Sequence, residues 1–224
     1  MKKKFAKVAA LFAAFVLVIV ATVGVTLAYL TDETTAVTNT FIAKSGLLEV
    51  DSTFTLTESA VKLNDTKDAF IKDDENLTPV TSNTYDGLLA GMTLYKDPVL
   101  NVGKFIAPSY LYIMVTDNLP AELTWTLAEG WTEIADVNGD ADGTGIPANK
   151  KLYVYNNGNA IAANTVVENL SLIQGNSVTV GDFDASEVEA GDNIQLIFQA
   201  FICQSTGVGT AAEAFASLFP NALV

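Results

Sequence analysis

KLYVYNN, residues 151–157, is a short stretch in which the side chains alternate with a period of two. Leu152 and Val154 fall on one side of an extended chain, and Tyr153 and Tyr155 fall on the other. β-Branched and aromatic residues at this period are typical of a strand. The stretch therefore predicts a β-strand, and it indicates the class of fold to expect around it.

Similar stretches recur along the chain and are separated by short polar segments. They are LLEVDSTFTLT (47–57), MTLYKDPVLNV (92–102), SYLYIMVTD (109–117), ELTWTLA (122–128), SVTVGDF (177–183) and NIQLIFQAFI (193–202). The separators include NGDADGTG and YNNGNA, whose Asn, Asp and Gly residues are typical of turns. Seven or more strands without helical patterns between them predict an all-β fold, an antiparallel β-sandwich. Jelly-roll-like and immunoglobulin-like topologies both remain open on this evidence.

One helix is expected near the C-terminus, in TAAEAFASLF (210–219). Thr210 and Glu213 have the spacing of a capping box, and the alanine-rich segment places Phe215 and Leu218 on an apolar face. We expect this short helix to cover one end of the sandwich. Recognition of a partner is the alternative.

The charge of the chain is strongly negative. Its 224 residues include 12 basic ones, all of them lysine, and 26 acidic ones, which gives a net charge of −14. Binding to nucleic acid requires positive side chains that neutralise phosphates, and docking on anionic lipid requires positive charge as well. The composition therefore excludes nucleic acid as a partner and suits a well-solvated exterior.

The sequence contains no histidine, the usual general base near neutral pH and the commonest metal ligand. A Ser-His-Asp triad, a Cys-His pair and an HExxH zinc site are therefore excluded. The one cysteine, Cys203, cannot form an internal disulfide and is predicted to be a small buried residue in a strand. No catalytic residue is assigned, because acidic segments such as KDAFIKDDENLTP (67–79) are typical of a solvated surface.

The N-terminus has the charge pattern of an export signal. Four lysines in MKKKFAK precede an uncharged run from Val8 to Leu27. The length of this run is typical of a membrane anchor, whereas Thr26 and Ala28 supply small residues at positions −3 and −1 of a cleavage site. Because no lysine follows closely, both alternatives place the chain beyond Tyr29 outside the cell.

The loop ADVNGDADGTG (135–145) is the best local candidate for a metal site. Asn138, Asp140 and Asp142 stand at the first, third and fifth positions of a calcium-binding loop, where alternate oxygen ligands surround a hard cation. The match fails at the twelfth position, where Asn149 replaces the bidentate glutamate. Calcium is therefore an alternative to an ordinary solvated loop, and no other cofactor is expected.

The junction LAYLTDETTAVTNTF follows the uncharged run and carries a recognisable series of residues. The series consists of Ala28, Tyr29, Leu30, Thr31 and Asp32, followed by Thr38, Asn39, Thr40 and Phe41. It resembles the export signals handled by the SipW-type signal peptidase of Gram-positive bacteria, which are carried by the TasA and camelysin (CalY) group of biofilm-matrix proteins. Two further segments, LLAGMTLYKDPVLNVG (88–103) and QAFICQSTGVGTAAEAF (199–215), are similar to segments of the same group, although Ala90 stands where proline is common.

The resemblance implies a jelly-roll-like subunit that is cleaved between Ala28 and Tyr29. Residues 1–28 are then the SipW-type signal peptide, residues 29–46 the mature N-terminal segment, and residues 47–224 the β-sandwich domain. The mature chain of 196 residues would carry eight lysines against 26 acidic residues.

The resemblance also implies assembly by donor-strand exchange, in which the mature N-terminal segment becomes a strand in the sheet of the next subunit. Thr38, Asn39, Thr40 and Phe41 are the residues expected in the donor strand. Two alternatives stay open: the segment is the ordinary first strand of its own sandwich, or it is a disordered leader.

Together, the residues and the resemblance predict a secreted structural subunit of extracellular biofilm-matrix or surface fibres. Its expected partners are other copies of itself and, for processing, a SipW-type signal peptidase; it would touch a membrane only through an uncleaved signal segment. One alternative is a surface adhesin or carbohydrate-binding module with exposed Tyr110, Tyr112, Tyr153 and Tyr155. The other is a camelysin-like metal-dependent peptidase, which the missing histidines disfavour, so no enzyme is expected.

Overall fold

The computed structural model describes residues 31–33, 46–137, 145–147, 149–182 and 194–219. The expected signal peptide (1–28) and its cleavage site at Ala28 and Tyr29 lie outside the described residues. The expected donor residues Thr38, Asn39, Thr40 and Phe41 lie outside them as well. In the described part of the chain, no helix is long and apolar enough to span a membrane.

The described residues form β-strands almost throughout, with one α-helix near the C-terminus. The strands are β1 (Thr31–Glu33), β2 (Phe54–Thr57), β3 (Val61–Leu63), β4 (Ala69–Lys72), β5 (Thr93–Tyr95), β6 (Val99–Val102), β7 (Ser109–Asp117), β8 (Leu123–Thr124), β9 (Trp131–Ile134), β10 (Lys150–Tyr155), β11 (Val167–Ser171), β12 (Ser177–Val180) and β13 (Leu196–Gln204). The helix is α2 (Ala211–Leu218).

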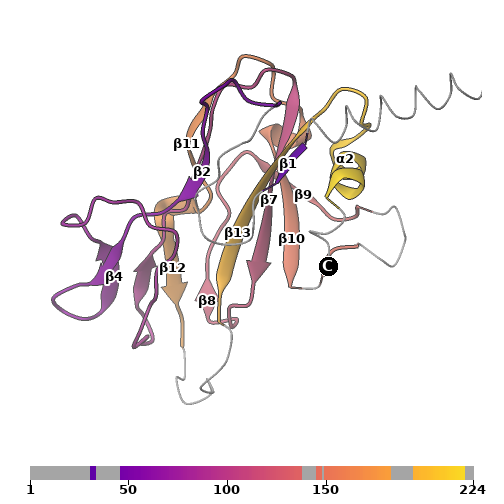
Figure 1. Cartoon of the computed structure of the whole chain (residues 1–224). Helices are drawn as coiled ribbons and strands as arrows, with labels where there is room; N and C mark the ends of the chain where they lie inside the picture. Colours follow the sequence, from indigo (N-terminus) through magenta and orange to yellow (C-terminus); the bar gives the residue numbers. More distant parts are fainter. Residues whose placement is uncertain (1–30, 34–45, 138–144, 148, 183–193, 220–224) are drawn as a thin grey trace, which may run out of the picture.

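Hydrogen bonds join these strands into three sheets. The central sheet has the order β1-β13-β7-β10-β9, the back sheet β11-β6-β2, and the side sheet β3-β4-β5-β12-β8. The central and back sheets share one hydrophobic core, and the side sheet lies beside them, away from α2 (Figure 1). The prediction of an all-β, antiparallel sandwich is confirmed, with a single parallel pair, β4 and β5, among the described strands.

Strands β7 and β13 form the middle of the central sheet and are paired along their full length. Leu111, Ile113 and Val115 face the core shared with the back sheet. Tyr112 and Met114, which alternate with them, face α2. A sheet covered on both faces requires nearly continuous apolar residues, which is why the run SYLYIMVTD contains so few polar ones.

The back and side sheets are linked because chain segments cross from one to the other. The segment 93–102 contributes β5 to the side sheet and β6 to the back sheet. Pro98 lies between the two strands, and proline has no N–H to continue a ladder. The prediction of a single strand over residues 92–102 is therefore wrong, since the chain bends at Pro98.

The strand predicted over residues 122–128 is also much shorter in the structure, where β8 has only two residues. Trp125 follows it and leaves the ladder, because its indole N–H donates to the Asp117 carboxylate at 2.9 Å. The Trp125 ring then packs edge-on against Phe198, with 5.6 Å between ring centroids. The alternation of side chains along the sequence does not predict such a contact.

The predicted C-terminal helix is confirmed together with its capping box. The Glu213 N–H donates to Thr210 Oγ1 at 3.3 Å, and the Thr210 N–H donates to Glu213 Oε2 at 2.8 Å. Phe215 packs against Tyr112 and Phe201, with 5.1 Å between ring centroids in each pair. The helix thus covers the outer face of the central sheet rather than an end of the sandwich.

Candidate assembly edge

β1 forms the outer edge of the central sheet, where it pairs antiparallel with β13 (Figure 1). The register places Thr31 opposite Cys203, Asp32 opposite Ile202, and Glu33 opposite Phe201. For these three residues, the pairing is that of an ordinary first strand within one chain. It also shows that Thr31–Glu33, which follow the expected cleavage site, can pair with the edge of β13.

The described residues pair with the two sides of β13 over different lengths. Nine residues of β13 pair with β7, from Leu196 opposite Asp117 to Gln204 opposite Ser109, and the three described residues of β1 pair with the other side. Main-chain hydrogen bonds of an edge strand do not depend on which copy of the chain supplies the strand. The pairing of β1 with β13 could therefore form within one chain or between two chains.

Cys203 lies opposite β1 and is fully buried, as predicted. Its Sγ lies 3.5 Å from the Tyr112 hydroxyl, which itself donates to the Ala211 carbonyl at 2.9 Å. Burial raises the pKa of the Cys203 thiol to about 11, although the Tyr112 hydroxyl opposes the shift. Only the thiolate is a strong nucleophile, so burial slows the reaction of this thiol with reagents from solution.

We expect Cys203 to resist alkylation in the native protein and to react once the protein unfolds. At pH 8, three units below its pKa, about one thiol in a thousand is ionised. Iodoacetamide should leave the mass of the native protein unchanged and should add one carboxamidomethyl group in urea. Equally fast modification in both conditions would contradict the burial of this thiol.

The four tyrosines of the adhesin alternative do not form an exposed patch. Tyr112 is fully buried under α2, and Tyr110 is half-buried beside it, with its hydroxyl donating to the Gly209 carbonyl at 3.3 Å. Tyr153 and Tyr155 pack against the core between the central and back sheets. Because a carbohydrate-stacking surface requires open ring faces, this set of side chains does not provide one.

Asn138, Asp140 and Asp142, the residues proposed for a calcium loop, lie outside the described residues. Across the ranges that are described, no three acidic, cysteine or histidine side chains are grouped so that they could hold a metal ion. The structure therefore brings together no carboxylate cluster of the kind that a metal-dependent peptidase needs within those ranges.

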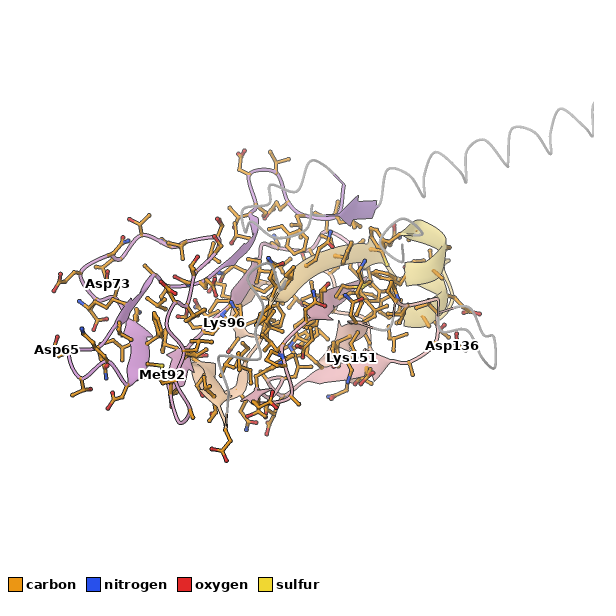
Figure 2. The ribbon with its side chains drawn as sticks, turned by 90° about the horizontal axis from the view of Figure 1, so that it is seen from below. Asp65, Asp73, Met92, Lys96, Asp136 and Lys151 are labelled. Carbon is orange, nitrogen blue, oxygen red and sulfur yellow. The ribbon has the colours of Figure 1, made fainter. Side chains whose placement is uncertain are left out.

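The acidic segment 67–79 lies at the outer end of the side sheet, where Figure 2 labels Asp73. Asp73 pairs with Lys62 at 3.0 Å, which holds the pKa of the Asp73 carboxyl below its usual value. Asp68 accepts hydrogen bonds from Asn64 and Thr66, both at 2.7 Å, and the pKa of its carboxyl is lowered as well. These carboxylates are occupied in surface contacts.

Lys96 and Asp97, from the segment similar to the TasA and camelysin group, lie at the bend between the back and side sheets. Lys96 Nζ is 2.8 Å from Glu58 Oε2, and their side chains are only 13% and 4% exposed. Asp97 accepts hydrogen bonds from the Ser59 N–H and hydroxyl, both at 2.7 Å, and from the Tyr95 hydroxyl at 3.0 Å. These contacts fasten the chain after β2 to the chain between β5 and β6.

Two later residues of the same segment also have structural contacts. Asn101 Oδ1 accepts the Asn169 N–H at 2.8 Å, at the point where the pairing of β11 with β6 shifts in register. Gly103 lies against Ser52, and a Cβ at position 103 would collide with the Ser52 side chain. The similarity in this segment therefore coincides with residues that hold the two sheets together.

Sequence reasoning missed Glu58 and Ser59, which complete this joint. They lie 38 residues before their partners, and TLTES carries no local pattern that marks them. The one signal was the Lys-Asp pair in MTLYKDPVLNV, because charged residues inside an apolar run require partners when they are buried.

Comparison with known proteins found no relative of this chain. No family model matches the chain, and neither the curated proteins nor the solved structures include a match. The resemblance to the TasA and camelysin group therefore remains a prediction from the sequence motifs.

Proposed function

We propose that this protein is a secreted structural subunit of extracellular fibres, of the biofilm-matrix or cell-surface kind, that assembles through its N-terminal strand. The antiparallel pairing of β1 with β13 at the edge of the central sheet is the observation that carries the proposal. In the fibre, the same pairing forms between neighbouring chains, so that β1 of one subunit completes the central sheet of the next. The connecting strand proposed is Thr31–Glu33, and not the residues Thr38, Asn39, Thr40 and Phe41 that the resemblance implies.

The connection between β1 and the rest of the domain supports such an exchange. Residues 34–45 join Glu33 to Gly46. When fully extended at about 3.3 Å per residue, a segment of this length spans roughly 40 Å. That length is the upper limit on the distance over which β1 could pair with an adjoining subunit while its own domain stays folded.

The charge of the chain sets a condition on assembly. A net charge of −14, which becomes −18 if residues 1–28 with their four lysines are removed, causes like-charged subunits to repel one another. Added salt screens this repulsion. We propose that assembly requires salt to screen this repulsion, and that it follows export and cleavage between Ala28 and Tyr29 by a SipW-type signal peptidase.

A single cysteine at position 31 tests the proposal, because the register pairs that position with the native Cys203. Opposite residues of an antiparallel pair have their Cβ atoms about 4.5–5.5 Å apart, close to the separation of about 3.5–4.5 Å that a disulfide requires. Exported Thr31→Cys protein is assembled at moderate salt, oxidised and run on a non-reducing gel. We expect a ladder of covalent multimers that collapses to the monomer on reduction.

Two variants control for accidental cross-linking. Asp32→Cys moves the new thiol to the opposite face of the strand and should give no ladder. Thr31→Cys combined with Cys203→Ala removes the partner thiol and should give none either. If the protein forms fibres under the microscope but Thr31→Cys gives only an internally linked monomer, β1 stays in its own chain and the proposed mode of assembly is wrong.

A further inference from the structure

A cavity of about 760 Å³ lies where the side sheet meets the sandwich. Leu94 and Val178 line it from the side sheet, Leu56 and Phe198 from the sandwich core, and Leu88 from the loop before β5. Two hydrophobic clusters thus meet at a space that the side chains of the described residues leave open. Its volume falls within the range of about 300–1,000 Å³ that is typical of sites for small molecules.

One charged pair faces this space, whose wall also includes the uncharged polar residues Thr81, Ser82, Asn83, Thr84, Tyr85 and Gln195. Glu58 and Lys96 both line the cavity, and Figure 2 labels Lys96 between the side sheet and the sandwich. The Glu58 side chain is 4% exposed and that of Lys96 is 13% exposed, so the ammonium is the more open of the two groups. The Lys96 ammonium has three N–H donors. Within the described chain, it donates to one acceptor, the Glu58 carboxylate.

A second polar group of the wall is already occupied. The Tyr85 hydroxyl donates to the Tyr95 carbonyl at 2.7 Å. Burial raises the pKa of the Tyr85 phenol, and the nearby Glu58 and Asp97 carboxylates raise it further. Tyr85 therefore stays neutral and bonded, and the Lys96 ammonium is the charged hydrogen-bond donor in the wall.

We propose that this cavity binds a neutral, mainly apolar small molecule with a hydrogen-bond-accepting oxygen at one end, such as a medium-chain alcohol or ester. Its hydrocarbon part would lie against the leucine, valine and phenylalanine side chains, and its oxygen would accept an N–H from Lys96. Glu58 neutralises Lys96 and would repel a ligand carboxylate at the same place. An alkyl ammonium group would meet Lys96 itself and be repelled by it.

Binding of octanol to the exported protein tests the site directly. Calorimetry would give its affinity, and shifts of backbone amide NMR signals would place it. We expect the largest shifts at residues 81–88, 94–98 and 194–198, and weaker binding of octanoate and octylamine. Leu88→Trp fills part of the cavity and should lower the affinity for octanol at least about tenfold, a loss of about 1.4 kcal/mol in binding free energy. Leu89→Trp is the matched control, since Leu89 is 60% exposed and does not line the cavity, and it should leave the affinity unchanged.

The double variant Glu58→Leu with Lys96→Met tests the polar end without leaving a buried charge. It should bind octanol more weakly than the native chain by about tenfold, and octanoate should still bind more weakly than octanol, because its carboxylate would be buried without a partner. The proposal fails if no binding occurs up to the solubility of octanol, if Leu88→Trp and the native chain bind equally, or if octanoate binds best. None of these outcomes bears on fibre assembly, which the cross-linking of position 31 tests separately.

Discussion

Replacing Lys96 by methionine is expected to lower the free energy of unfolding by about 3–5 kcal/mol, because it leaves the Glu58 carboxylate buried without its partner. Methionine keeps most of the apolar stem of lysine, so the effect reports on the charge and not on lost volume. Urea unfolding followed by tryptophan fluorescence would measure the change in the transition midpoint.

The double variant Glu58→Leu with Lys96→Met supplies the decisive comparison. Removing both charges of a buried pair is often neutral or stabilising, so most of the lost stability should return. Lys104→Met is the matched control, since Lys104 pairs with Glu49 at 3.3 Å on the surface, where the two side chains are 39% and 54% exposed. It should change stability by less than about 1 kcal/mol. A double variant as unstable as the single one would show that apolar side chains cannot replace this pair.

Truncation of Phe215 to alanine is expected to cost about 3–5 kcal/mol, through lost burial and the cavity that remains. The side chain is fully buried and contacts Tyr112, Phe201 and Phe219, with ring centroids 5.1 Å away in each case. It is the central contact of α2 on the central sheet. The loss would appear in thermal unfolding as a lower Tm.

A second variant of α2 separates packing from helix formation. Ser217→Ala lies on the exposed side of the same helix and removes only the hydroxyl bonded to the Ala214 carbonyl at 3.1 Å. Because alanine favours helix, its effect should stay within about 0.5 kcal/mol of the native chain. In Phe215→Ala, the Cys203 thiol beneath the helix should also alkylate faster. A stable Phe215→Ala protein with an unreactive thiol would mean that α2 does not depend on this contact.

Much of the fold could be predicted from local patterns, and the reason differs from element to element. β10 was predictable because Leu152 and Val154 face α2, while Tyr153 and Tyr155 face the sandwich core. The helix α2 was predictable because its capping box lies within four residues. β3, β4, β9 and β11 were not expected, since strands of three to five mixed residues carry too short a pattern.

Less of the candidate site could be predicted. The sequence motifs indicated the N-terminal segment as a strand, but its place beside β13 is a pairing between the two ends of the chain. Glu58 was not predicted at all, because only folding brings it to Lys96. The proposed calcium residues Asn138, Asp140 and Asp142 lie outside the described residues, so that prediction stands as it was made.

The sequence by itself determined the all-β class, the acidic exterior, the absence of histidine chemistry and the capped helix. Each of these follows from composition or from residues within a few positions of one another, where intrinsic conformational preferences act. Only the tertiary structure decided that the chain bends at Pro98, that Glu58 meets Lys96 beside a cavity, and that β1 lies at the edge of β13. Those features depend on the packing of segments far apart in the chain, where the burial of one group is set by side chains that local patterns do not specify.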